Sequence, residues 1–317
     1  MKKALLLLLA LAMICGCAVS CKENKQDGEP MGSETEQLPE YPAFYVKDGY
    51  AVETLYPMVP SMLDYAGDYF GDIHETYLKD KASNIYFSVI PDKNYFLADK
   101  ANIPHMDYKV FVDTLCEKLP FTTYIDIFDT LQIEDYYRTD LHWRQEALLE
   151  TAQALAAAMG VTLNATYTEV TLDTPFAGEY TEEVAESVTP DTLVYLTNEM
   201  LQGCTVTEYG TGVAKEGVMY HTSKAEGKAP YDMFLHGPNP LLVLENPNAT
   251  TDKHLIIFRD SFTSSLAPLL CEGYSKITLI DLRYIRSSAI GGYVDFTDAD
   301  VLFIYSANIL NTSMIMH

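Results

Sequence analysis

The sequence predicts an α/β protein with a mostly parallel sheet flanked by helices. Between residues 61 and 160, segments with apolar residues at helical spacing alternate with short apolar runs that are typical of buried strands. The same alternation returns after residue 254. This order favours parallel strands joined by helices that pack on the sheet. Between the two regions, about residues 161–240 carry short Thr- and Val-rich runs separated by Gly and Pro, which predict an inserted, mostly β elaboration.

Residues 1–21 have the pattern of a bacterial lipoprotein signal peptide. Met-Lys-Lys precedes an uncharged apolar run at residues 4–14, which is shorter than the roughly 20 residues of a membrane-spanning helix. Small residues then precede Cys17 and again Cys21, and in lipoproteins a cysteine at such a box is lipidated. Cys17 is favoured because a large apolar residue lies three positions before it. An ordinary secretory signal with incidental cysteines is the alternative interpretation.

The remaining chain divides into a tether and a folded region. Residues 22–40 are polar and rich in Glu, which predicts a disordered tether. Residues 41–317 are expected to form the α/β domain, and they are numerous enough for one large domain or two smaller ones.

Each predicted element rests on the spacing of its apolar residues. Helices are expected at residues 61–79, 106–119, about 148–159 and 264–270, and Gly160 is expected to end the third. Strands are expected at residues 85–90, 123–128, 254–258, 276–281 and 301–305, with shorter ones at 191–196 and 204–209 in the insertion. Residues 91–94 and 134–140 are expected to be loops.

Composition excludes several classes of function. The formal net charge of −24 disfavours binding to the phosphate backbone of nucleic acids. The cysteines after the tether and the seven histidines are dispersed along the chain, so neither a metal site nor a cofactor is expected. The 23 tyrosines suit carbohydrate stacking, although Tyr also fills protein cores.

Two segments offer the parts of a Ser-His-Asp site. Ser261 follows the strand predicted at residues 254–258 and precedes a helix, which is where α/β sheets bind ligands. Asp140 and His142 are two residues apart, and in an extended segment both side chains lie on one face. The Asp140 carboxylate could then hold the imidazole of His142 in one tautomer. The alternative interpretation is helix capping, by Asp260 or Ser261 in one segment and by Thr139 or Asp140 in the other.

Residues 136–143, with Asp140, Leu141, His142 and Trp143 at their end, resemble the signature of the DHHW proteins of Gram-positive bacteria. Leu141 stands at the position of the first His of that signature. Further segments that match the family's pattern are residues 85–96 with Pro91-Asp92-Lys93, 231–240, 255–262 and 280–284. The resemblance covers nearly all of the chain from residue 41.

The resemblance implies a three-layer, SGNH-hydrolase-like (flavodoxin-like) fold related to the acetyltransferase domains that act on alginate. In those domains an Asp-x-His motif precedes the nucleophilic Ser in the chain. It therefore implies Ser261 as the nucleophile, His142 as the base and Asp140 as the residue that orients His142. Arg259 stands where ordinary SGNH hydrolases have a Gly before the Asp-Ser pair.

Other residues are candidates by their position near strand ends. Arg283 could bind a carboxylate or acyl oxygen, and a structural ion pair is the alternative. Tyr284 and Lys93 are further candidates for substrate binding. Trp143 is expected to pack in the core behind His142 rather than to stack on a sugar.

Together these features predict a lipid-anchored protein at the extracellular face of the cytoplasmic membrane. The resemblance implies O-acetyl transfer to a surface or secreted polysaccharide, with a membrane-bound O-acyltransferase as acyl donor. A carbohydrate acetyl esterase is one alternative. A non-catalytic lipoprotein for glycan binding or assembly is another.

Overall fold

A computed structural model describes residues 41–184 and 188–317. The predicted signal peptide and tether, including Cys17 and Cys21, lie outside these residues. Within the described chain, no helix is both long enough and apolar enough to cross a membrane.

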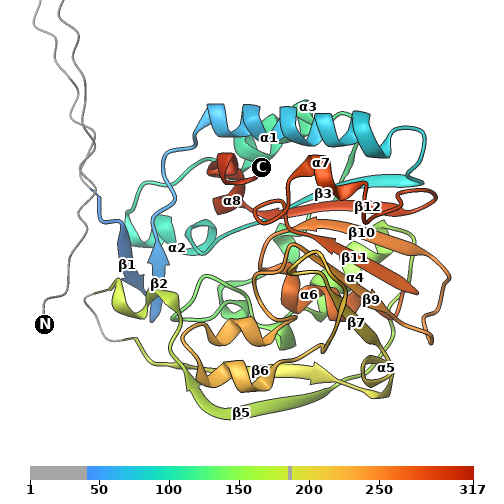
Figure 1. The fold of residues 1–317 in the computed structure, drawn as a ribbon. Coiled ribbons are helices and arrows are strands. Elements are labelled where there is room, and N and C mark those ends of the chain that lie inside the picture. Colours follow the sequence, from blue (N-terminus) through green and yellow to red (C-terminus); the bar gives the residue numbers. More distant parts are fainter. Residues whose placement is uncertain (1–40, 185–187) are drawn as a thin grey trace, which may run out of the picture. The chain divides into compact units, whose positions relative to one another are not determined.

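The centre of the described chain is an eight-stranded sheet in the order β4-β3-β12-β10-β11-β9-β7-β8 (Figure 1). The strands of its parallel part are β4 (Thr123–Tyr124), β3 (Asn84–Ile90), β12 (Asp300–Ser306), β10 (His254–Arg259) and β11 (Lys276–Ile280). The antiparallel part adds β9 (Leu241–Glu245), β7 (Thr205–Glu208) and β8 (Lys215–Gly217). The prediction of a mostly parallel sheet is therefore confirmed.

Alternating side chains of the central strands give the sheet two apolar faces, and helices cover both. In β10, Ile256 and Phe258 point into one cluster, whereas Leu255 and Ile257 point into another. The first face is covered by α1 (Pro60–Ile73), α3 (Tyr108–Lys118), α7 (Ser287–Ile290) and α8 (Ala307–Asn311) (Figure 1). The second is covered by α4 (Leu149–Ala158) and α6 (Thr263–Leu270). The protein thus has the three layers that the family resemblance implied.

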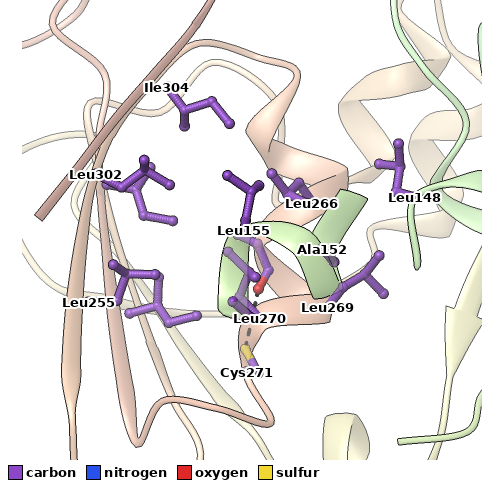
Figure 2. Close-up of a cluster of buried hydrophobic side chains, with 14 of the residues drawn as sticks. Leu148, Ala152, Leu155, Leu255, Leu266, Leu269, Leu270, Cys271, Leu302 and Ile304 are labelled. Carbon is purple, nitrogen blue, oxygen red and sulfur yellow. Dashed lines mark hydrogen bonds between the residues drawn. The ribbon is translucent and has the colours of Figure 1, made fainter. Parts of the chain in front are cut away.

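Figure 2 shows how the second face is filled. Leu155 of α4 and Leu266 of α6 lie between the two helices and the strand residues Leu255 and Leu302. All four side chains are fully buried. This packing fixes the start of α6, which follows the predicted nucleophile.

Most predicted elements lie within a few residues of the observed ones. The helix predicted at residues 61–79 is α1 followed by a π-helical turn, His74–Leu78. Gly160 has φ +75° just after α4, as expected for a residue that ends a helix. The strand predicted at residues 123–128 was too long, because Asp126 Oδ1 accepts a hydrogen bond from Phe128 N and turns the chain after β4.

Several observed elements were not predicted. They include the strands β1 (Phe44–Lys47), β2 (Tyr50–Glu53) and β9, and the helices α2 (Asn94–Ala101), α7 and α8. Strands β1 and β2 form a separate antiparallel hairpin. Helix α2 begins within the segment that was interpreted as a loop after β3.

The predicted insertion is rich in strands, as expected, and it has two parts. Strands β5 (Thr168–Phe176) and β6 (Asp191–Thr197) pair only with each other. After the short helix α5 (Glu199–Gln202), β7 and β8 instead join the main sheet through β9. The insertion therefore widens the central sheet in addition to forming its own hairpin.

Candidate active site

Ser261 lies in the tight turn between β10 and α6, and the buried Asp260 carboxylate holds this turn. Asp260 Oδ1 accepts a hydrogen bond from Phe262 N at 3.1 Å, and Oδ2 accepts one from Ser306 N at 2.7 Å. The turn is thereby tied to the carboxyl end of the neighbouring strand β12. Ser261 is presented at the edge of the sheet where α/β proteins bind ligands.

The imidazole of His142 lies between Ser261 and Asp140. Its Nδ1 is 2.6 Å from Asp140 Oδ1, and its Nε2 is 2.7 Å from Ser261 Oγ. Asp140 Oδ1 also accepts a hydrogen bond from the backbone N–H of His142 at 3.0 Å. Helix α4 begins only at Leu149, so neither His142 nor Asp140 belongs to it. The structure therefore brings the three residues together in the order that the sequence suggested.

Asp140 is buried, yet it is kept ionised. Burial alone would raise the pKa of the Asp140 carboxyl, but the charge and hydrogen bonds of His142 outweigh burial and lower this pKa below its usual value. Glu179 N donates a further hydrogen bond to Asp140 Oδ2 at 3.1 Å. An ionised carboxylate at this place holds Nδ1 of the imidazole protonated and leaves Nε2 to accept a proton.

Gly178 leaves room for this carboxylate. A Cβ at position 178 would lie 2.3 Å from Asp140 Cβ and 2.6 Å from Thr139 O. The backbone of Gly178 is extended, with φ −78° and ψ −177°, so space rather than conformation requires the glycine.

Aromatic rings fix the plane of the imidazole. The ring of Tyr231 stacks on His142 with centroids 3.7 Å apart and an interplanar angle of 8°. Tyr231 Oη lies 2.7 Å from Ser265 Oγ. Trp143 Nε1 donates to Phe262 O at 2.9 Å and to Ser265 Oγ at 3.0 Å. Trp143 is fully buried, so the expectation that it packs in the core is confirmed.

The three residues face a cavity of about 190 Å³. Its other polar lining residues are Glu179, Asp232, Arg259, Ser264, Arg283 and Tyr284. Arg283 forms a bidentate ion pair with Asp281, in which Nε donates to Oδ1 at 2.9 Å and Nη2 donates to Oδ2 at 2.7 Å. Tyr284 is 49% exposed, and the Arg283 guanidinium lies 5.3 Å from its ring centroid. Two of the three predicted substrate-binding residues, Arg283 and Tyr284, thus lie at the cavity of Ser261.

Lys93, the third predicted substrate-binding residue, lies elsewhere. It is only 3% exposed, and it lines a separate small cavity with Tyr180 and Asn94. Its ammonium donates to three backbone carbonyls, those of Ala51, Tyr137 at 3.1 Å and Asp140 at 2.8 Å. Burial lowers the pKa of Lys93 to about 7, although Asp140 and other carboxylates oppose this effect. The side chain therefore supports the Asp140 loop from behind.

Arg259 takes part in the site although its position suggested only a departure from the SGNH pattern. Its side chain is buried next to the turn that contains Ser261, and Nη1 donates to Ser264 Oγ at 3.0 Å. Nη1 also lies 3.9 Å from Asp281 Oδ2. The structure thus places a fixed positive charge at the wall of the cavity.

Sequence reasoning assigned no role to Tyr231, Glu179 and Gly178. Glu179 reaches Asp140 across 39 residues of chain, and Tyr231 reaches Ser265 across 34. These contacts depend on how the insertion folds back over the site. The one local signal was that Tyr231 begins a segment, residues 231–240, that matches the DHHW pattern.

Comparison with solved structures shows that this chain is similar in fold to several known proteins. No protein-family model matches the sequence, and no curated protein matches it. A DHHW family protein from Eubacterium siraeum is similar with a TM-score of 0.66 and 21% identity, over 84% of this chain and 91% of that one. Bacillus cereus PatB1 with a sulfonyl adduct is similar with a TM-score of 0.67 and 18% identity, over 84% of this chain and 95% of that one.

The O-acetyltransferase domain of Pseudomonas putida AlgJ gives a TM-score of 0.51 and 14% identity, over 86% of this chain and 93% of that domain. The described chain therefore has the α/β fold shared by a DHHW family protein, PatB1 and the AlgJ O-acetyltransferase domain, in agreement with the resemblance seen in the sequence.

Proposed function

We propose that this protein is an SGNH-type O-acyltransferase that transfers an acetyl group to a hydroxyl of a surface or secreted polysaccharide. The observation that carries the proposal is the continuous contact from Asp140 through His142 to Ser261 at the wall of the cavity. A non-catalytic glycan-binding lipoprotein would have no need of this alignment.

In the first half-reaction, His142 Nε2 accepts the proton of Ser261 Oγ as that oxygen attacks the carbonyl carbon of an acetyl ester. Asp140 stabilises the imidazolium that forms. When the tetrahedral intermediate collapses, the bond to the donor oxygen breaks and His142 returns the proton to it. In the second half-reaction, an acceptor hydroxyl attacks the acetyl-Ser261 ester by the same route, which regenerates the Ser261 hydroxyl.

Two groups support stabilisation of the oxyanion. Within the described residues, the backbone N–H of Ser261 has no hydrogen-bond acceptor, so it is available to the developing negative charge. The Arg259 guanidinium at the cavity wall adds a fixed positive charge. Arg259 would in this way compensate for the glycine that ordinary SGNH hydrolases carry at its position.

The lining of the cavity favours a carbohydrate acceptor. The carboxylates of Glu179 and Asp232 can accept hydrogen bonds from sugar hydroxyls, and the exposed ring of Tyr284 offers a stacking surface. We assign Arg283 to the same acceptor site. Lys93 is instead a positioning residue, because its three donated hydrogen bonds end on backbone carbonyls.

The likeness to the AlgJ O-acetyltransferase domain supports transfer as the outcome. A membrane-bound O-acyltransferase would supply the acetyl group. Lipidation of Cys17, or of Cys21, would hold the enzyme at the extracellular face of the membrane next to that donor.

The proposal is tested by turnover of p-nitrophenyl acetate with and without an oligosaccharide acceptor. The Ser261→Ala and His142→Ala substitutions should each lower the rate of nitrophenol release by at least about 10³-fold, because the two side chains act together. The control is Ser275→Ala, which should keep full activity because the Ser275 hydroxyl donates to Lys253 O outside the cavity.

The same assay separates the remaining functions. Acetylated oligosaccharide formed by the wild type supports transfer, and acetate alone supports the carbohydrate esterase. Equal background rates in the wild type and both variants would contradict an enzymatic role and favour a glycan-binding protein.

A further inference from the structure

A second cluster of chemically capable side chains lies apart from the Ser261 site. Glu208 at the end of β7 lies between two imidazoles: His221 Nε2 is 3.2 Å from Oε1, and His236 Nδ1 is 2.8 Å from Oε2. The two imidazole centroids are 4.3 Å apart. The three ligand atoms all lie within 4.8 Å of one another. Folding thus brings His221 and His236, which lie 13 and 28 residues after Glu208 in the sequence, into contact with its carboxylate.

The surrounding chain makes room for this carboxylate. The Glu208 side chain is only 12% exposed, and within the described residues its hydrogen-bond partners are the two imidazoles. A Cβ on Gly217, in the neighbouring strand β8, would lie 2.6 Å from Glu208 Oε1. The glycine therefore lets the carboxylate fold back over β8 toward the histidines.

Unusual backbone places the third residue. Leu235 and His236 both have left-handed φ values, 50° and 67°, which are uncommon for residues with a side chain. Such conformations cluster at functional sites, where the surrounding structure holds them. Here Lys224 Nζ fixes the peptide by donating to His236 O at 3.0 Å. The segment is thereby bent so that His236 Nδ1 faces Glu208.

We propose that Glu208, His221 and His236 bind a zinc ion. Two imidazole nitrogens and one carboxylate oxygen are a ligand set that Zn²⁺ takes with a fourth position left to water. Without metal, the ring nitrogens that contact Glu208 donate hydrogen bonds to its carboxylate. On binding, the proton of each neutral ring moves through solvent to the other nitrogen, Nδ1 of His221 and Nε2 of His236, which leaves a lone pair on the contacting nitrogen for the metal. His236 is 42% exposed, which leaves a path for the ion to enter.

The zinc would fix one wall of the candidate active site. Gly237 and Pro238, directly after His236, line the cavity of Ser261, and so does Asp232. A Cβ on Gly237 would lie 2.1 Å from Asp232 Oδ1, so the two chain segments are closely packed. The ion would thus act on the shape of the cavity, as a structural site linked to β7, and it would take no part in the acyl transfer itself.

The experiment uses the full, tag-free protein after dialysis against a chelator. Zinc binding is measured by calorimetric titration, and cobalt is substituted for an absorption spectrum of the bound metal. We expect one ion per chain in the wild type. His221→Gln and His236→Gln should each weaken zinc binding by at least tenfold, and thermal unfolding should show a zinc-dependent rise in midpoint only where binding persists.

Two controls make the result decisive. His105→Gln removes an imidazole that pairs with one carboxylate, Asp99, outside the cluster, and it should bind zinc like the wild type. His142→Ala should also bind zinc like the wild type. Circular dichroism without metal establishes that each variant is folded. Wild-type protein that binds no stoichiometric zinc, binding unchanged in the cluster variants, or binding lost only in His142→Ala would each overturn the proposal.

Discussion

Asp140 is the residue on which the geometry of the site depends. Its two carboxylate oxygens accept hydrogen bonds from His142 Nδ1, His142 N and Glu179 N, and its carbonyl accepts one from Lys93. The contacts of Glu179 and Lys93 come from distant parts of the chain, and the other two come from His142 in the same loop. A change that moves this loop should therefore affect the imidazole even when His142 is intact.

Gly178→Ala tests this dependence. The added Cβ overlaps Asp140 Cβ, so we expect a loss of at least about tenfold in acyl-ester turnover and a destabilisation of about 1–3 kcal/mol. Turnover assays and urea unfolding measure the two effects.

The control is Gly71→Ala in α1, where no atom lies within 4 Å of the added methyl group. It should leave turnover unchanged and be neutral or stabilising by up to about 1 kcal/mol, since Ala favours helix over Gly. Equal effects of the two substitutions would contradict the account.

Lys93 gives the protein a specific dependence of stability on pH. Its pKa is about 7 in the folded protein and about 10.4 in an unfolded chain. Between these pH values the unfolded chain binds more protons, so this group makes the free energy of unfolding rise with pH. Below about pH 7 the lysine is protonated in both states and contributes no slope.

The comparison is with Lys93→Met, which retains the apolar stem of the side chain. We expect the free energy of unfolding of the wild type, measured in urea, to rise relative to that of the variant between pH 7 and pH 9. A difference that stays constant or shrinks over this range would rule out the depressed pKa.

At the residue scale, the sequence was informative where the chemistry is local. Asp140 and His142 are two positions apart, and Ser261 follows a recognisable strand, so the candidates could be named from their own segments. The stacking of Tyr231 on His142 and the pairing of His221 with His236 across Glu208 arise only when distant segments fold together. Spacing along the chain carries no signal for such contacts.

Among the elements, α4 and α6 hold the turn that contains Ser261 in place by packing on the second face of the sheet. Leu155 of α4 is fully buried in this layer (Figure 2), whereas Leu149 of the same helix is 37% exposed. Leu155→Ala should lower the free energy of unfolding by about 2–5 kcal/mol, because it leaves a cavity between two helices and the sheet.

Leu149→Ala is the matched control and should change the free energy of unfolding by no more than about 0.5 kcal/mol. Urea unfolding of both variants measures the difference. If both substitutions destabilise the protein to the same extent, α4 does not pack as described.

Elements with a strong apolar period were predictable, and short or amphipathic ones were not. The central strands β10, β11 and β12 are continuous apolar runs, because both of their faces are covered by helices. Helix α2 has a weak apolar face and begins directly after a Pro-containing loop, so its residues resembled part of that loop. The four-residue strands β1 and β2 are too short for their period to stand out.

For the molecule as a whole, the proposed lipid anchor would determine where the folded domain acts. Replacement of the lipidated cysteine should release the protein from the membrane fraction, because it removes the acyl chains that would insert into the bilayer. We expect Cys17→Ser to abolish incorporation of labelled fatty acid, and Cys21→Ser to leave it unchanged. Incorporation lost only in Cys21→Ser would place the anchor at Cys21, and labelling retained in the double variant would contradict lipidation at either residue.

Covalent acylation of Ser261 is the central step of the proposed mechanism. The most direct measurement is tandem mass spectrometry of the peptide that contains Ser261, after brief reaction with p-nitrophenyl acetate or with a sulfonyl fluoride. We predict one adduct on Ser261 in the wild type and its near-complete loss in His142→Ala, because the hydroxyl then has no base. A wild-type protein that forms no adduct, or forms it on another residue, would contradict the assignment of Ser261 as the nucleophile.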